Sequence, residues 1–202
     1  KRQAYIDALL ASLLPTGAVT GISNAALLYT LPVSLFGISV AASELPVMAG
    51  AMGTSGREAV RNRLELGLRR IAYFTVPSSV AFLALGDVIA GAVLQTGRFT
   101  PADAQYVWGI LGGAAVGLVA STLGRLYSST YYAMGDPRTP LRFACVRLAL
   151  TTVLGYAGAL WLPHALGIDT RWGAAGLTAS AGVAGWVEMF LLRGELRRAG
   201  TN

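Results

Sequence analysis

The sequence predicts an all-α fold, a polytopic transmembrane helix bundle, and three observations support this class. Hydrophobic residues make up 54% of the 202 residues and charged residues 13%, about half of the ~25% found in soluble domains. Long apolar runs are separated by short polar breaks, and none shows the period of a strand. One run carries small residues at every fourth position, a spacing that lets two helices approach closely in a bilayer. A soluble bundle with a buried core helix is the alternative.

We expect five full spans and one partial N-terminal helix within a single transmembrane domain, 1–202. The partial helix, 4–14, is shorter than the ~20 residues that a membrane core needs, so the chain is expected to begin inside a helix, as a fragment does. The full helices are expected at about 19–48, 57–86, 104–134, 139–162 and 173–197.

Local features refine the prediction for the first two of these helices and for the segment around Asp87. Pro32, in the middle of 19–48, predicts a bend. Residues 57–70 carry five arginines and are expected to lie on the membrane surface as an amphipathic helix before the next span. Asp87 precedes a short apolar run, 88–95. We interpret it as the N-cap of an interfacial helix, with an intramembrane carboxylate as the alternative.

The next helix is predicted to begin at Thr100-Pro101-Ala102-Asp103, because proline suits the first helical position. Its residues at every fourth position form one stripe on the helix, and they are Gly113, Gly117, Ser121 and Arg125. Arg125 lies ~14 Å from the end of this helix, a depth at which an arginine costs roughly 2.5–3.5 kcal/mol by insertion scales. Arg125 therefore either contacts substrate or an aqueous cavity, or forms a salt bridge that locks two helices.

Arginines are distributed unequally between alternate loops. Ten lie after the helices 19–48 and 104–134 and in the C-terminal tail, whereas the other two complete loops hold two. The positive-inside rule places the arginine-rich set in the cytoplasm. This placement also explains the net charge of +6, because the arginines flank apolar runs and form no basic patch, interleaved with aromatics, that would bind nucleic acid.

The residue types needed for catalysis or metal binding are scarce. Cys145 and His164 are the only cysteine and the only histidine, so neither an internal disulfide nor a cysteine-based zinc site can form. No nucleophile has a base at usable spacing, and the glycines lie within apolar helices, where packing explains them. The sequence therefore predicts neither an enzyme nor a metal site.

Four segments resemble one family of bacterial transporters. The run LGRLYSSTYYAMGDPRTPLR, 123–142, resembles the signature at the fourth helix of the second lobe in lipid II flippases, the MurJ/MviN family. The segments YIDALLASLLPTGAV, LPVSLFGISVAASELP and QTGRFTPAD resemble that family in the same order. The likeness covers essentially the whole chain, and the D-x-R-T-P turn after an aromatic pair is its most specific part.

The resemblance implies a second-lobe fragment from the MATE-like multidrug, oligosaccharidyl-lipid and polysaccharide exporter superfamily. Members have two six-helix lobes around a central cavity, so this chain would supply the end of helix seven and helices eight to twelve. The implied activity is translocation of lipid-linked peptidoglycan precursor, lipid II, across the bacterial cytoplasmic (inner) membrane by alternating access in cell-wall biogenesis. The implied partners are that precursor, membrane lipids and the missing first lobe.

Two other functions stay open beside the flippase. A related exporter of polyprenyl-linked oligosaccharides or drugs is supported by Leu27, which stands where the family often has a cavity-facing arginine. A truncated, non-transporting membrane scaffold is the other, since one lobe cannot enclose a cavity. Some relatives bind a cation through an acid that Asp7 matches, which would give Na⁺ or H⁺ coupling. Gly155 and Ala159, however, occupy the places of further polar ligands, and no other cofactor is implied.

Several polar residues are candidates for the transport path. Asp7 and Arg125 are expected at similar depths, so we hypothesise that they pair, or that protonation or cation binding at Asp7 releases Arg125. Asn24, Tyr29 and Ser34 are candidates for the cavity wall, although hydrogen bonding between helices is the simpler interpretation.

The basic loop formed by Arg138, Arg142 and Arg147 is expected on the cytoplasmic side. Arg138 and Arg142 signal topology or meet anionic head groups, and snorkelling to the interface explains Arg147 as well as a functional role does. Glu44 and Glu188 lie within one to two turns of cytoplasmic helix ends, where we expect interfacial water to solvate them.

Overall fold

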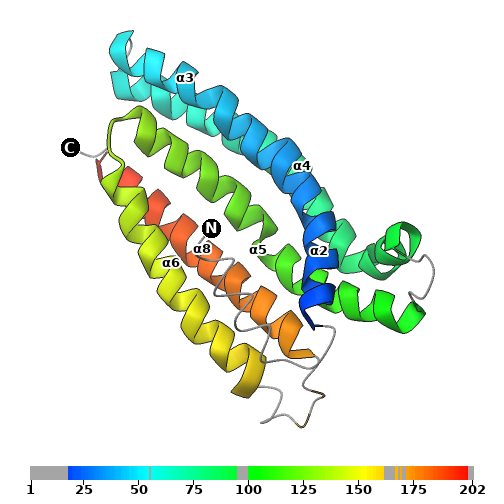
Figure 1. Ribbon diagram of the computed structural model, residues 1–202. Coiled ribbons are helices and arrows are strands. Elements are labelled where there is room, and N and C mark those ends of the chain that lie inside the picture. Colours follow the sequence, from blue (N-terminus) through cyan, green and yellow to red (C-terminus); the bar gives the residue numbers. More distant parts are fainter. Residues whose placement is uncertain are drawn as a thin grey trace.

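The computed structural model is a bundle of long helices (Figure 1). It describes residues 18–54, 56–94, 100–161, 167, 169 and 172–199, and these ranges contain no strand. Five helices are long and apolar enough to cross a membrane, namely Val19–Met52, Gly56–Leu94, Pro101–Ala133, Arg138–Ala159 and Gly173–Arg198. The predicted fold class with its five full spans is therefore confirmed. The partial helix 4–14 lies outside the described residues.

The first span consists of α2 (Ala18–Pro32), a π-helix η1 (Val33–Ile38) and α3 (Ser39–Thr54). The change to π-helix follows Pro32, which has no N–H to donate to the preceding turn. The Ser39 N–H donates to the carbonyl of Ser34, five residues before it. Such π-turns are a common cause of helix bending, so the proline marks the irregularity that the sequence predicts.

The next helix, α4 (Gly56–Leu94), is continuous over 39 residues and therefore ~58 Å long. Residues 57–70, which we expect to lie on the membrane surface, are continuous with the span that follows them, as the predicted helix 57–86 implies. Val60, Leu64 and Ile71 of α4 pack with Met48 of α3 in one hydrophobic core, and this packing holds α3 and α4 side by side as a hairpin (Figure 1).

Asp87 differs from its prediction, because it lies inside α4 and does not begin an interfacial helix. The helix continues past it because Ala90 is buried in the bundle core. Asp87 and Arg70 are both exposed, and their seventeen-residue separation spans ~26 Å along the helix. That length is close to the ~30 Å thickness of a membrane core, so these two charges mark the limits of the α4 span.

Side-chain hydrogen bonds cap the start of α5 (Pro101–Ala133) and order the turn that follows its end. At its start, Thr100 Oγ1 accepts the Asp103 N–H (3.3 Å) and Asp103 Oδ2 accepts the Thr100 N–H (2.9 Å), as the sequence predicts. At its end, Asp136 accepts the N–H groups of Arg138 and Thr139 and the Thr139 hydroxyl. These hydrogen bonds, the one from the Thr139 hydroxyl first, lower the pKa of Asp136 and start α6 (Arg138–Tyr156).

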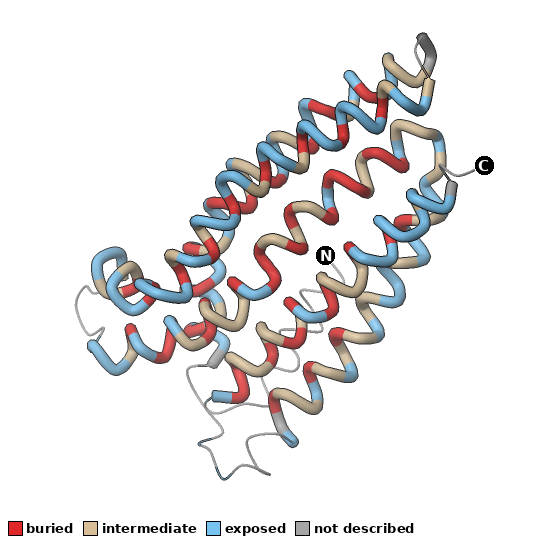
Figure 2. The backbone as a smooth tube through the Cα atoms, turned by 180° about the vertical axis from the view of Figure 1, so that it is seen from behind, coloured by how far each residue is buried: buried red, intermediate tan, exposed pale blue. Residues whose placement is uncertain are grey.

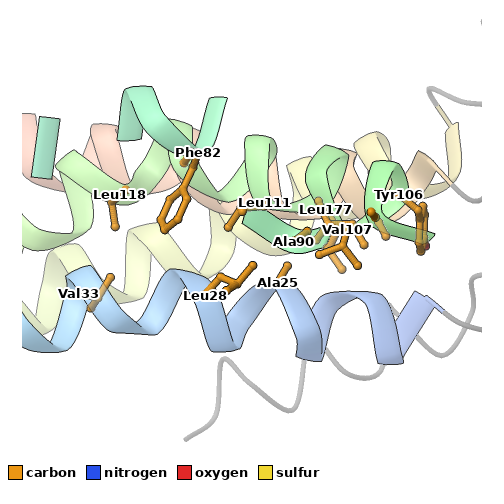
Figure 3. Packing of buried hydrophobic residues seen from close by; sticks show 14 of the residues in the cluster. Ala25, Leu28, Val33, Phe82, Ala90, Tyr106, Val107, Leu111, Leu118 and Leu177 are labelled. Carbon is orange, nitrogen blue, oxygen red and sulfur yellow. The ribbon is translucent and has the colours of Figure 1, made fainter. Parts of the chain in front are cut away.

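Helix α5 is the central helix of the bundle (Figure 2), with much of its length buried. It packs against α4, against the first span and against α8 (Gly173–Ala199). A first core includes Leu28, Val33, Phe82, Leu111 and Leu118 (Figure 3). A second core, further along α5, includes Met48, Leu64, Ile71, Leu126 and Leu192. Helix α6 continues as a π-helix, η2 (Ala157–Trp161), and packs on the side of α8.

Glycines bring the backbones of α5 and α8 into contact, as the stripe on α5 predicts. A Cβ atom added at Gly117 would lie 2.4 Å from the Cα of Gly182, and one added at Gly113 would lie 2.6 Å from the carbonyl oxygen of Ala175. Polar side chains add hydrogen bonds between the helices, because Thr178 Oγ1 donates to the Ile110 carbonyl (2.9 Å). Small residues and such bonds are what hold helices together in lipid.

The arginine-rich segments lie together at one end of the bundle. The tip of the α3–α4 hairpin, the turn between α5 and α6, and the C-terminal end of α8 all lie at the upper left of Figure 1. We call this the arginine-rich end. The connections that the sequence assigns to the cytoplasmic side by their arginine content therefore all lie at the same end of the bundle.

Replacing Gly117 with alanine is expected to destabilise the bundle by about 2 kcal/mol or more, because backbone, not a flexible side chain, occupies the space of the new methyl group. Gly194→Ala on α8 is the matched control, since nothing lies within 4 Å of its Cβ position. Thermal unfolding of the purified protein in detergent measures both. Equal melting temperatures for the two variants would contradict the α5–α8 contact.

Candidate functional site

Arg125 lies on the surface of α5, one turn after a hydrogen-bonded pair. Its residue is exposed, and within the described part of the chain it has no ion pair or hydrogen bond. Tyr29 Oη of α2 lies 2.9 Å from Ser121 Oγ, and Ser121 Oγ lies 3.1 Å from the Leu118 carbonyl. Ser121 can therefore donate to the carbonyl while it accepts from Tyr29.

Arg125 belongs to a polar face of α5. Positions 121, 125, 128, 129 and 132 fall within an arc of about 100° on a regular helix. We call this set the polar face, and its members are Ser121, Arg125, Ser128, Ser129 and Tyr132. Arg125 and Tyr132 are exposed, and the three serines are half-buried. Four hydroxyl groups thus accompany the guanidinium on one side of the helix.

The polar face lies between two neighbours that pack on α5. On one side, Gly124 faces Met189 of α8, and Tyr131 Oη donates to the Leu192 carbonyl (2.9 Å). On the other side, Gly37 of η1 packs against Thr122, where an added Cβ would lie 2.7 Å from Thr122 Cγ2.

The exposed surface of α4 over residues 74–86 is apolar, and its contrast with the polar face indicates what each surface faces. Val76, Val80 and Leu83 are exposed on α4. Apolar surface is stable against lipid, whereas an unpaired guanidinium in hydrocarbon is costly. The polar face is therefore the side of the lobe suited to water or to a polar ligand.

The structure brings together some of the sequence-predicted site residues. Tyr29 reaches Ser121 by the interhelical hydrogen bond that the simpler interpretation expects. Ser34 instead donates to the carbonyls of Thr30 and Leu31 (2.8 and 3.1 Å) on its own helix. Asn24 is half-buried and makes no hydrogen bond among the described residues. Asp7, with its hypothesised pairing to Arg125, lies outside those residues.

Arg147 and Glu188 join α6 to α8 in an ion pair. Arg147 Nη1 lies 2.9 Å from Glu188 Oε2, with side chains only 26% and 13% exposed. Snorkelling of Arg147 and interfacial solvation of Glu188 are both wrong. The two side chains lie on helices in contact, and each neutralises the other. Arg147 is ~14 Å along α6 from the start of that helix. Arg138 and Arg142 are exposed at that start.

Glu44 is buried and not solvated at an interface as predicted. Its side chain is 8% exposed, and its Oε1 lies 3.5 Å from Arg70 Nη1. The error has a structural cause, because α3 continues to Thr54 and places Glu44 in the middle of the α3–α4 hairpin. Gly67 of α4 lies beside Glu44 and makes room for Leu126 of α5, since a Cβ there would lie 2.7 Å from Leu126 Cδ2.

Sequence reasoning missed Ser128, Ser129 and Tyr132 as members of the polar face. The signal was present, because they follow Arg125 at three, four and seven residues, the spacings that share one side of a helix. In the described ranges no group of three or more His, Cys, Asp or Glu side chains could hold a metal ion.

These features define a class of protein. Five membrane-length helices, close glycine contacts between them and a polar face with an unpaired arginine define a multi-pass α-helical membrane protein with a polar surface at membrane depth. The sequence profile described as "Lipid II flippase MurJ" matches residues 3–201. The chain belongs to the MurJ family, which confirms the resemblance.

Relatives and one solved structure agree with this assignment. The chain is 29% identical over 176 residues to a probable lipid II flippase MurJ of Rhizobium meliloti, covering 87% of this chain and 31% of the relative. It is 24% identical over 186 residues to that of Vibrio cholerae, covering 92% and 34%. A structure described as "Lipid II flippase MurJ, inward closed conformation" has the same fold, with a TM-score of 0.83 at 22% identity over 96% of this chain and 39% of that chain. The chain thus spans about a third of the length of these relatives.

Removing Glu188 is expected to leave Arg147 as an unpaired charge between helices. Glu188→Leu should lower the free energy of unfolding by about 2–3 kcal/mol, less than for fully buried pairs because both groups keep some exposure. Adding Arg147→Met should restore most of the loss. Glu65→Leu is the matched control, since its 3.7 Å pair with Arg61 is exposed and should contribute little. Unfolding of Glu188→Leu at the same denaturant concentration as Glu65→Leu would contradict the pairing.

Proposed function

We propose that this chain is the second lobe of a flippase that moves lipid II across the bacterial cytoplasmic membrane by alternating access. Family membership and the names of the relatives support the proposal. Those names describe whole proteins, of which this chain spans about a third. A first lobe is therefore the partner needed to complete a cavity around the polar face.

The unpaired Arg125 on the polar face is the observation that carries the proposal. Lipid II holds a diphosphate between its sugar head group and its lipid tail, and a guanidinium matches phosphate oxygens in geometry and in charge. Hydroxyls of the polar face, such as those of Ser128 and Tyr132, can bond to sugar or phosphate. The lipid tail would stay in the bilayer, against apolar surface such as that of α2.

Ion coupling remains part of the proposal. Binding of Na⁺ or H⁺ at Asp7 would couple movement of the anionic head group to an ion gradient and so give transport a direction. The proposed role of Asp7 is to bind the cation and so control the charge beside Arg125.

Arg125→Ala is expected to abolish function in cells that depend on this protein. The test is growth of a flippase-depleted strain that expresses the complete gene product with Arg125→Ala, Arg125→Lys or Arg61→Ala. Loss of a charged hydrogen bond to the diphosphate weakens binding by about 10-fold or more, so the alanine variant should fail, lysine should rescue in part, and Arg61→Ala should rescue fully. Membrane levels are matched by immunoblot. Full rescue by Arg125→Ala would remove Arg125 from the mechanism.

A second candidate function is export of a different polyprenyl-linked oligosaccharide. The observation that favours it is Leu27, exposed on α2 where the resemblance leads us to expect an arginine. Transport of fluorescent lipid II and of a polyprenyl-diphosphate oligosaccharide into liposomes separates the two, because only the correct cargo should move at a rate that depends on Arg125. A scaffold without transport activity would move neither cargo.

A further inference from the structure

Helix α6 is attached to the bundle mainly through one seam with α8. At the far end of the seam, a Cβ atom added at Gly176 of α8 would lie 2.3 Å from the carbonyl oxygen of Gly158 in η2. Eleven residues earlier in the chain, Arg147 of α6 pairs with Glu188 of α8. The two helices run antiparallel (Figure 1), so these two contacts fix their register.

Thr151, between the two contacts, differs from the other buried hydroxyls. It is 1% exposed, and its Oγ1 has no hydrogen-bond partner among the described residues. Its neighbour Thr152 donates to the Leu148 carbonyl (2.9 Å), so this part of α6 can accept such a bond. The other buried serine and threonine hydroxyls in the described ranges all donate to a backbone carbonyl, and they are Thr75, Ser79, Thr122, Thr130 and Ser180. A buried hydroxyl without a partner destabilises the fold.

A second unpartnered group lies one helical turn from Thr151. Arg147 Nη1 binds Glu188, but Arg147 Nε is buried and has no partner among the described residues. Residues four apart share one side of a helix, with Cβ atoms ~5–6 Å apart. A water molecule that makes two hydrogen bonds of ~2.8 Å spans a similar distance. Four residues before Glu188, Ala184 of α8 is opposite Thr151 in this register, and its small side chain leaves room.

The charges in the seam indicate which ligand fits between the two groups. Arg147 and Glu188 already neutralise each other, so an added ion would leave a net charge at membrane depth, which is costly. A water molecule is neutral, and it can accept from the Nε–H while it exchanges a hydrogen bond with the Thr151 hydroxyl. Buried waters in proteins occupy such positions, where polar groups lack protein partners.

We propose that the Arg147 Nε–H and the Thr151 hydroxyl share one bound water molecule in the seam between α6 and α8. The water completes the hydrogen bonds of the guanidinium and so holds it toward Glu188. Thr151 is therefore a positioning residue for Arg147, and the hydrated ion pair helps to fix α6 on α8. The proposal goes beyond the proposed function, since it holds for any cargo.

Thr151→Val tests the water site by the sign of its effect, because valine keeps the shape of threonine and removes the hydroxyl. With bound water, the variant leaves the water and Arg147 with fewer hydrogen bonds. The melting temperature of the complete gene product in nanodiscs should then fall by about 2 °C or more, and Thr151→Ser should retain most of it. Thr152→Val is the matched control, with a smaller expected shift. A Thr151→Val melting temperature that is raised or unchanged would show a dry seam and overturn the proposal.

Two further measurements link the effect to Arg147. In an Arg147→Met, Glu188→Leu background the seam is apolar, so Thr151→Val should raise the melting temperature or leave it unchanged. An equal loss in both backgrounds overturns the link. A cryo-electron microscopy map that resolves ordered water should show a peak within about 3.2 Å of Arg147 Nε and Thr151 Oγ1. An ion there, no peak, or a Thr151 hydroxyl bonded to its own helix overturns the site. All these readouts concern the seam alone, so their failure leaves the proposed function standing.

Discussion

The close approach of the α5 and α8 backbones is the contact on which the rest of this lobe depends. Lipid supplies no hydrophobic drive between helices, so their association relies on surfaces that fit. Gly113 and Gly117 give α5 one side flat enough to meet Gly182 and its neighbours. One side of α5 packs against α8 and another packs against α4. The side that remains, in the half of α5 nearer the arginine-rich end, can therefore be polar. The packing thereby determines where Arg125 points.

Local rules account for much of the fold. The proline at position 32, the cap at Thr100 and the aspartate of the α5–α6 turn each act within a few residues, so their effects can be read from the chain. The apolar runs likewise predict five spans. The polar face could have been found by the same means, because its serines and Tyr132 repeat at helical spacings from Arg125.

The partners of buried charges could not be predicted, for a different physical reason. Their depth was counted from expected helix ends, but α3 and α4 continue past those ends as a hairpin, which changes the surroundings of Glu44. Pairing of Arg147 with Glu188 depends on how α6 and α8 are rotated toward each other, and that rotation is set by contacts distant in sequence. Charge placement in this lobe is a tertiary property.

The two ion pairs that involve buried or half-buried charges differ in how fully they neutralise those charges. Arg147 with Glu188 neutralises an arginine between two helices, and Arg70 neutralises only one oxygen of Glu44. Arg125 alone among the described residues at membrane depth keeps an exposed guanidinium without a partner. The bundle pairs Arg147 with a carboxylate but leaves Arg125 without one. This difference is consistent with a surface at Arg125 that receives an anionic ligand.

The central claim is that position 125 faces water at membrane depth. The most direct measurement is labelling of Arg125→Cys by a charged, membrane-impermeant thiol reagent in the complete protein, compared with Val80→Cys on the apolar surface of α4 in the same Cys145→Ser background. The account predicts that the cysteine at position 125 reacts and that lipid protects the cysteine at position 80 from the reagent. Equal protection of both positions would place Arg125 against lipid and contradict the account.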